Sequence, residues 1–182
     1  MMGIEIERKF LVNRIPFQLD QYPVREIEQG YLSVSPAIRV RRDNEAYYMT
    51  YKEIRAYPGQ IGQNEYNLPL TKEAYEHMIA KADGYIIRKQ RYLLPLNYDA
   101  YDDVFLQAHP DLARRIGDGS MKIELDVFAP SAPAPFADLV IAEIEYPSSD
   151  AYEAYRPAAW FAADVTGDPA YSNAQLSMLR YT

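Results

Sequence analysis

Polar and apolar residues alternate along the first segment of the chain, residues 4–12, with the period of two that is typical of a β-strand. This alternation places Glu5, Glu7 and Lys9 on one face of the predicted strand and isoleucines on the other. Two acids and one base on a shared face either bind a metal ion together with a polyanion or simply face solvent. The remaining segments have to decide between these two interpretations.

The same alternation recurs in later segments and predicts seven further strands. These strands are expected at residues 25–35, 38–41, 47–52, 63–68, 86–92, 121–128 and 139–146. Residues 43–45 are expected to form the turn of a hairpin. Residues 95–120 break the pattern, which predicts an irregular insertion with one short helix, a candidate flap over an opening.

Helix signals occur at three places between or after these strands. Thr71 is a predicted cap for a helix at residues 72–82, and Ser149 is a predicted cap for a helix that ends at Tyr155. A last short helix is expected after Asn173. Strands with a few inserted helices predict an α+β fold dominated by one antiparallel sheet.

Charged residues two positions apart recur on the predicted strands, and the opposite strand faces are apolar. The charged positions are Glu5, Glu7, Lys9, Arg39, Arg41, Lys52, Lys89, Arg91, Glu124, Asp126, Glu143 and Glu145. If the apolar faces pack on helices and the sheet closes, the charges point inward, where a sheet of about eight strands has room for one small ligand. Buried charges without partners cost several kcal/mol, so such an interior has to hold water, ions or a charged ligand. A metal-bound phosphate chain satisfies both the carboxylates and the basic side chains.

Composition narrows the class of protein. A chain of 182 residues with 48% hydrophobic and 25% charged residues is typical of a soluble globular domain. The net charge of -7 argues against a broad surface for nucleic acid, although a local basic pocket remains compatible with it. The absence of cysteine leaves oxygen-rich sites for hard cations as the metal chemistry to expect. With neither a signal peptide nor an apolar run of about 18 residues, we expect a cytoplasmic protein without a membrane partner, as a monomer or homodimer.

The segment Glu5-Ile6-Glu7-Arg8-Lys9 resembles the Glu-x-Glu-x-Lys signature of the CYTH superfamily, the triphosphate tunnel metalloenzymes. Further motifs follow in order: Gln29-Gly30-Tyr31-Leu32, Arg39-Val40-Arg41, Thr50-Tyr51-Lys52, Lys89-Gln90-Arg91, Glu124-Leu125-Asp126, Glu143-Ile144-Glu145, Asp164-Val165-Thr166 and Tyr171-Ser172-Asn173. This resemblance implies one domain over residues 1–182. The implied fold is an eight-stranded antiparallel closed β-barrel with a charged interior and helices packed outside.

The resemblance also implies hydrolysis of inorganic tripolyphosphate with Mg2+ or Mn2+, with nucleoside triphosphates as poorer substrates. The implied ligands of a first metal ion are Glu5, Glu7 and Glu143, and those of a second metal ion that orients the attacking water are Asp126 and Glu145. Glu65 is a further implied metal ligand. The implied substrate-binding residues are Lys9, Arg39, Arg41, Lys52, Lys89 and Arg91, and the implied catalytic residues are Lys9, Asp126 and Glu145.

The chain departs from the family's pattern in two places, at Gln63 and Asn67 and in the stretch 95–120, which is longer than in compact bacterial relatives. Many relatives have Arg-x-Glu-x-Glu where this chain has Gln63-Asn64-Glu65-Tyr66-Asn67, so one basic residue and one carboxylate are missing. The same metal site would also serve a class IV adenylyl cyclase that forms cyclic AMP from ATP. Gln63 and Asn67 favour a third alternative, a non-catalytic protein that binds polyphosphate or nucleotide. Arg8 has the opposite parity and is expected to lie outside the barrel and to be replaceable.

Overall fold

The computed structural model describes residues 2–53, 62–129 and 138–179. The strands in this part of the chain are β1 (Met2–Glu5), β2 (Glu7–Leu11), β3 (Val24–Val34), β4 (Ala37–Asp43), β5 (Ala46–Lys52), β6 (Gln63–Pro69), β7 (Asp83–Leu94), β8 (Ile123–Phe128), β9 (Val140–Glu145) and β10 (Ala163–Asp164). They form one antiparallel sheet in the order β1-β6-β5-β4-β3-β7-β8-β9-β2-β10. Each strand predicted from the alternation has a counterpart in this sheet, and the first is divided into β1 and β2.

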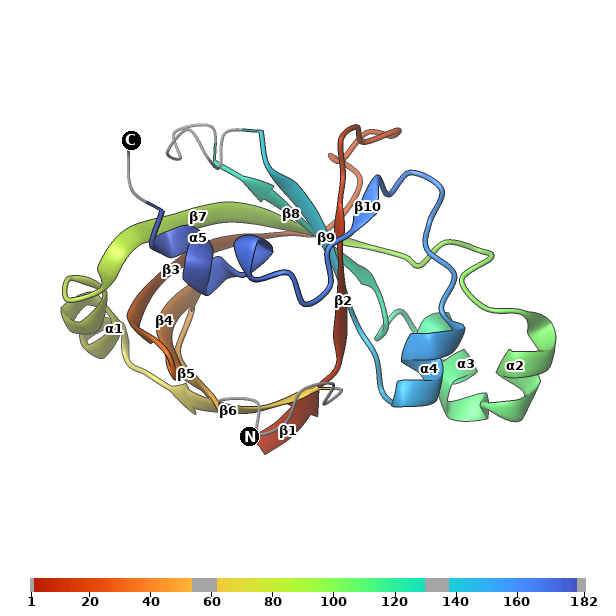
Figure 1. Cartoon of the computed structure of the whole chain (residues 1–182), viewed down its shortest axis with the longest axis horizontal. Helices are drawn as coiled ribbons and strands as arrows, with labels where there is room; N and C mark the ends of the chain where they lie inside the picture. The colour runs from red at the N-terminus through yellow and green to blue at the C-terminus, as the bar shows by residue number, and fades with distance from the viewer. Residues whose placement is uncertain (1, 54–61, 130–137, 180–182) are drawn as a thin grey trace.

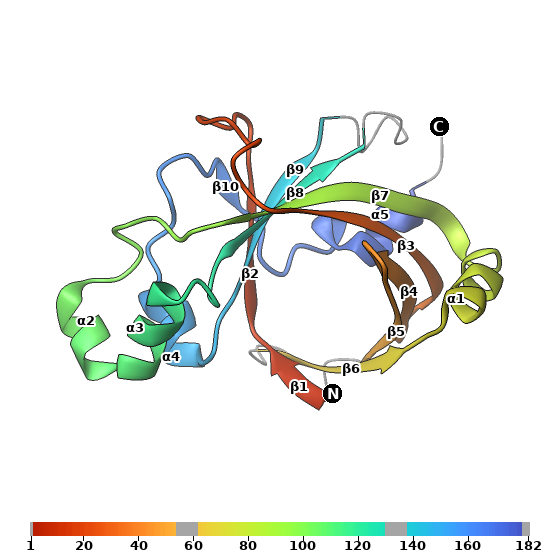
Figure 2. The same cartoon turned by 180° about the vertical axis from the view of Figure 1, so that it is seen from behind.

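The prediction of an eight-stranded closed barrel is wrong. The sheet has ten strands in the described residues, and no ladder of hydrogen bonds joins its edges β1 and β10. It curves strongly, so that β6 and β9 approach the same N-terminal segment from opposite sides (Figures 1 and 2). In that segment β1 pairs with β6 and β2 pairs with β9, while Ile6 lies between the two strands. The two parts of the sheet are therefore connected there by the covalent chain, because a strand cannot pair laterally with its own continuation.

The hairpin of β4 and β5 confirms the turn predicted at residues 43–45. Asp43 lies opposite Ala46 in the register, and Asn44 has a positive φ of 52°. The side chain of Asn44 accepts a hydrogen bond of 2.8 Å from the backbone N–H of Glu26 on β3. Asparagine tolerates this left-handed conformation better than most residues, which explains its place at the turn. The hairpin fixes the positions of the basic side chains along β4 and β5.

The outer helices are α1 (Lys72–Ile79), α2 (Asp103–Ala108), α3 (Pro110–Gly117) and α4 (Ser149–Ala154). The Thr71 cap is confirmed, since its side chain accepts a hydrogen bond from the backbone N–H of Ala74. The cap of α4 is Ser148, one residue before the predicted position. None of the helices in the described residues is long and apolar enough to cross a membrane.

The insertion at residues 95–120 contains two helices, α2 and α3, where one was predicted. Pro110 begins the second helix directly after His109, a position where proline is favoured because its missing N–H is not needed. Leu112 of α3 belongs to a buried apolar cluster with Phe10 of β2 and Ile144 of β9. None of the residues from 95 to 120 is among those that line the central cavity. The insertion therefore covers the outer face of the sheet and does not act as a flap over the cavity.

The C-terminal segment has a different position from the other helices. It contains the short helix η2 (Pro169–Tyr171) and α5 (Asn173–Ser177), which follows a cap at Ser172. Leu176 of α5 packs with Tyr31 of β3 and Ile87 of β7 in a second apolar cluster, and α5 lies inside the curve of the sheet (Figure 1). The prediction that all helices pack outside is therefore wrong for α5. This helix fills part of the concave side and leaves the rest to the cavity.

Candidate functional site

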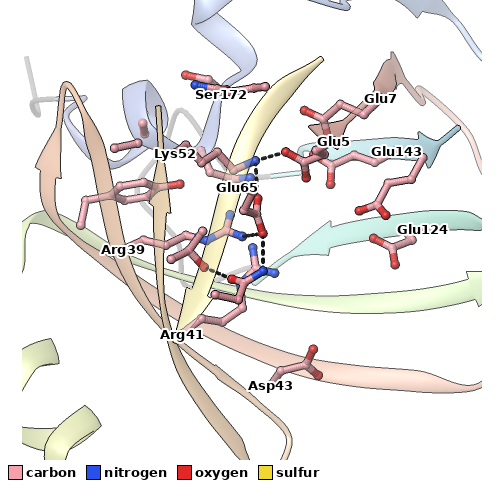
Figure 3. Close-up of a pocket in the computed structure, with 18 of the residues that line it drawn as sticks. Glu5, Glu7, Arg39, Arg41, Asp43, Lys52, Glu65, Glu124, Glu143 and Ser172 are labelled. Carbon is pink, nitrogen blue, oxygen red and sulfur yellow. Dashed lines mark hydrogen bonds and ion pairs between the residues drawn. The ribbon is translucent and has the colours of Figure 1, made fainter. Parts of the chain in front are cut away.

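A cavity of about 1000 Å³ lies on the concave side of the sheet, and charged side chains from nine strands, β1 to β9, line it. Figure 3 shows part of this lining. Ten of the twelve predicted site residues are among the lining residues: Glu5, Glu7, Lys9, Arg39, Arg41, Lys52, Glu65, Arg91, Glu143 and Glu145. They occupy alternate positions on their strands, as the parity argument predicts. The other two predicted residues, Lys89 and Asp126, do not line the cavity.

Lys89 and Asp126 form a buried ion pair instead. The two residues are only 2% and 1% exposed. Burial lowers the pKa of Lys89 to about 8 in spite of the nearby Asp126 carboxylate. Asp126 also accepts hydrogen bonds of 2.6 and 2.7 Å from Nε and Nη2 of Arg91. Asp126 therefore holds the neighbouring basic side chains and is not exposed on the cavity wall.

Arg91 connects this buried pair to the cavity. Besides Asp126, its guanidinium group donates to Glu124 and, through Nη2, to Oε2 of Glu143 at 2.6 Å. Burial alone would raise the pKa of Glu143, but Lys9 and Arg91 hold it well below the ordinary value. Glu124 was not among the predicted site residues, although its parity with Asp126 was a signal for it. Arg91 thus pairs with carboxylates of β8 and β9 and keeps Glu143 ionised at the cavity wall.

Lys9 bridges two carboxylates of the same wall. Its Nζ lies 2.6 Å from Oε1 of Glu143 and 3.1 Å from Oε1 of Glu7. Burial alone would lower the pKa of Lys9, but Glu143 and Glu7 raise it above its ordinary value. Lys9 therefore remains protonated and available to an anion in the cavity.

Glu7 and Glu145 lie directly opposite each other in the pairing of β2 with β9, where like charges destabilise a sheet. The side chain of Glu145 is open to the cavity and has no hydrogen bond or ion pair within the described part of the chain. Desolvation by the cavity walls, together with Glu124, Glu5 and Glu7, raises the pKa of Glu145 to about 7. Burial and Glu7 also raise the pKa of Glu5. This side of the cavity carries more negative charge than its own basic residues offset.

The chemistry of this wall suits a divalent cation, although its carboxylates are not gathered around one point. Carboxylate oxygens are the preferred ligands of hard cations such as Mg2+ and Mn2+. Within residues 2–53, 62–129 and 138–179, no group of three or more acidic or histidine side chains already has the spacing of a metal site. Glu5 is paired with Lys52, and Glu143 with Lys9 and Arg91. The carboxylate oxygens of this wall and the uncompensated charge of Glu145 therefore fit a divalent cation. In this structure, however, the carboxylates of Glu5 and Glu143 point toward basic side chains.

The opposite wall carries the basic side chains of β4 and β5, together with Glu65 of β6. Nζ of Lys52 lies 2.9 Å from Oε2 of Glu65, and Nη2 of Arg39 lies 3.8 Å from Oε1 of Glu65. Burial alone would raise the pKa of Glu65, but Lys52 and Arg39 lower it to about 2. The buried Nε of Arg39 has no hydrogen-bond partner in the described residues, which is a costly state for a guanidinium group. Part of this wall is therefore unsatisfied without an anion.

The side-chain amide of Asn67 has a local role on this wall. Asn67 donates a hydrogen bond of 2.8 Å to Oε1 of Glu65 and accepts one of 2.6 Å from Oγ1 of Thr50. These contacts hold Glu65 beside Lys52 and Arg39. Glu65, which the sequence suggested as a metal ligand, is thus placed as a counter-ion of the basic wall.

Arg8 lies outside the cavity, as its parity predicts. Its Nε donates to Oδ2 of Asp164 at 3.2 Å, and its guanidinium carbon lies 5.0 Å from the centre of the Phe10 ring. It also lies 5.5 and 6.0 Å from the ring centres of Tyr152 and Tyr155. These contacts tie β2 to β10 and to the region of α4. Arg8 therefore has a packing role that strand parity alone does not predict.

We expect Arg8→Ala to lower the free energy of unfolding by about 1–2 kcal/mol, because an ion pair and cation–π contacts are lost together. Binding of anions in the cavity should stay unchanged, since the side chain points away from it. Urea unfolding and calorimetry with tripolyphosphate would measure the two effects, with the exposed Arg14→Ala as control. A loss of binding without a loss of stability would contradict this assignment.

Comparison with known proteins adds independent information. The model of the CYTH domain family matches residues 3–115. The inorganic triphosphatase of Nitrosomonas europaea is 31% identical over 178 residues, which cover 96% of this chain and 97% of that protein. The inorganic triphosphatase of Acetivibrio thermocellus is 28% identical over 180 residues, with 96% and 94% covered. The crystal structure of the inorganic triphosphatase NE1496 matches with a TM-score of 0.61 at 28% identity and covers 97% of this chain and 95% of that one.

Proposed function

Because the chain belongs to the CYTH family, we propose that it hydrolyses inorganic tripolyphosphate in the cavity on the concave side of its sheet. The observation that carries this proposal is the division of the cavity into two walls, one with buried basic side chains that lack full compensation and one with excess carboxylates. A phosphate chain bound together with a divalent cation compensates both walls at once. The inorganic triphosphatase relatives support the same substrate.

The basic residues would bind and orient the phosphate chain. Arg39, Arg41 and Lys52 act from the basic wall, while Lys9 and Arg91 act from the carboxylate wall. Phosphoryl transfer needs chiefly positioning and neutralisation of charge, and buried donors supply both. Lys89 does not line the cavity, and its contribution is indirect. It pairs with Asp126, which in turn holds Arg91.

The carboxylate wall would hold Mg2+ or Mn2+. The ligands that we assign to it are Glu5, Glu7, Glu143 and Glu145. When bound, the cation supplies charge neutralisation on the phosphate oxygens and activation of the attacking water. As Lys9 and Lys52 donate to phosphate, the carboxylates now paired with them become available as ligands. Before a cation binds, desolvation and the neighbouring carboxylates hold the pKa of Glu145 near 7, and a bound cation would favour its ionised, ligating form.

Asp126 and Glu65 receive other roles than the sequence suggested. Asp126 is buried between Lys89 and Arg91, so we assign it the positioning of Arg91. Glu65 keeps Lys52 and Arg39 in place on the basic wall until substrate binds.

Phosphate release from tripolyphosphate tests this function directly. We expect turnover with Mg2+ or Mn2+, loss of turnover when EDTA removes the cation, and a strong decrease in the Glu7→Gln variant. Glu153→Gln, an exposed substitution on α4, is the matched control and should retain turnover. Turnover that persists in EDTA, or that Glu7→Gln leaves unchanged, would contradict the proposal. Formation of cyclic AMP and pyrophosphate from ATP would support a cyclase instead, and tripolyphosphate binding without turnover would support a binding protein.

A further inference from the structure

Arg41 differs from the other basic residues of the candidate site. Each of the others has a carboxylate partner: Lys9 has Glu7 and Glu143, Arg39 has Glu65, Lys52 has Glu5 and Glu65, Lys89 has Asp126, and Arg91 has Glu124, Asp126 and Glu143. Arg41 has no carboxylate partner within the described residues, although it is only 6% exposed. A buried charge without a counter-ion is unfavourable. An anion from outside the chain would therefore compensate the guanidinium charge of Arg41.

Two neutral side chains hold Arg41 in place. Gln29 on β3 and Tyr48 on β5 lie directly opposite Arg41 in the register of three adjacent strands. Nε of Arg41 donates to Oε1 of Gln29 at 2.9 Å, and Nη1 donates to the hydroxyl oxygen of Tyr48 at 3.2 Å. Nη2 makes no hydrogen bond within the described residues, and Arg41 lines the cavity. The guanidinium group is thus held by Gln29 and Tyr48, while Nη2 has no partner in the described residues. Figure 3 labels Arg41 among the residues that line the cavity.

The amide of Gln29 is an unfavourable choice for stability alone. Gln29 is fully buried, and its Nε2 has no hydrogen-bond partner in the described part of the structure. Turning the amide would not help, because Nε2 would then face the N–H of Arg41. A glutamate has the same shape, lacks the unpaired N–H and would form an ion pair with Arg41. It would also neutralise the charge of Arg41.

We propose that Gln29 is a positioning residue that orients Arg41 as a phosphate anchor while leaving its positive charge uncompensated. An amide can accept the hydrogen bond of Nε without adding a negative charge, which a carboxylate cannot do at neutral pH. The anchor then offers its full charge and its free Nη2 to one phosphate group of the substrate. The inference rests on the proposed function for the identity of the anion, a tripolyphosphate.

The Gln29→Glu variant tests the inference by the sign of two effects. We expect its Kd for tripolyphosphate, measured by calorimetry in EDTA, to rise about 10- to 100-fold, because a charge-assisted contact is lost. Its thermal unfolding midpoint should stay equal or rise. A merely structural role for Gln29 would lower the midpoint and the affinity together. Gln107→Glu, exposed on α2, adds the same charge far from the cavity and should change neither quantity.

A double-mutant cycle with Gln29→Met and Arg41→Met keeps the test valid if the glutamate variant does not fold. If Gln29 acts through Arg41, the double variant should bind tripolyphosphate as weakly as Arg41→Met alone, with no additional loss. Additive losses of affinity, or a Gln29→Glu variant that binds like the wild type, would overturn the inference. These assays measure binding without metal or turnover. A failure to hydrolyse tripolyphosphate would therefore reject the proposed function, while the binding data would still decide whether Gln29 acts through Arg41.

Discussion

Replacement of Arg91 by methionine is expected to lower the free energy of unfolding by about 3–5 kcal/mol, the usual cost of leaving buried ions without their partner. Arg91 is 7% exposed and contacts Glu124, Asp126 and Glu143 at once. Without it, Asp126 would keep Lys89 and Glu143 would keep Lys9, but Glu124 would lose its ion-pair partner within the described residues. Excess negative charge would then remain in a region that water reaches poorly.

The same strand provides a matched control for this prediction. Arg88 lies on the opposite face of β7, its side chain is 60% exposed, and its Nε lies 2.6 Å from Oε2 of Glu28. Since exposed ion pairs contribute little, Arg88→Met should cost less than about 1 kcal/mol. Urea unfolding in EDTA at neutral pH would compare the two variants. Equal losses for Arg88→Met and Arg91→Met would show that the Arg91 cluster is solvated and not a buried network.

The faces of the strands could be predicted from the sequence because side-chain direction alternates strictly in a strand. Parity alone placed Glu7 and Lys9 in the cavity and Arg8 outside it, and it identified the basic face of the hairpin. Strand parity does not predict how deeply each side chain on a face is buried. Glu124 and Asp126 share a face, yet Glu124 lines the cavity while Asp126 is buried beneath it between Lys89 and Arg91.

The departure from a closed barrel also has a physical cause that the alternation does not contain. Residues 4–12 read as one strand, but their two parts pair with different neighbours, β6 and β9, on either side of Ile6. Its carbonyl oxygen accepts a hydrogen bond of 2.8 Å from the backbone N–H of Tyr146, beyond the end of β9. The position of α5 was equally hidden, because an apolar residue such as Leu176 fits either face of a curved sheet. Such features depend on partners distant in the sequence, which local patterns cannot identify.

Replacement of Glu145 by glutamine should have opposite effects on stability and on turnover. The pKa of Glu145 in the folded chain, about 7, lies above the ordinary value of 4.5. Its contribution to stability is therefore fully present below about pH 4.5 and is lost as the pH rises through 7, where the folded protein has to hold the ionised carboxylate. At about pH 8 in EDTA, removal of this charge should raise the unfolding midpoint.

Turnover of tripolyphosphate by Glu145→Gln should fall by more than about 100-fold, since loss of a proposed metal ligand exceeds the 10- to 100-fold cost of losing its outer partners. Glu153→Gln removes the same charge from the exposed face of α4 and should leave both quantities unchanged. If Glu145→Gln lowered turnover and stability together, the carboxylate would be part of the structural network of the wall. A gain in stability with a loss of turnover would instead mean that the chain maintains an unfavourable charge opposite Glu7 because a bound cation requires it.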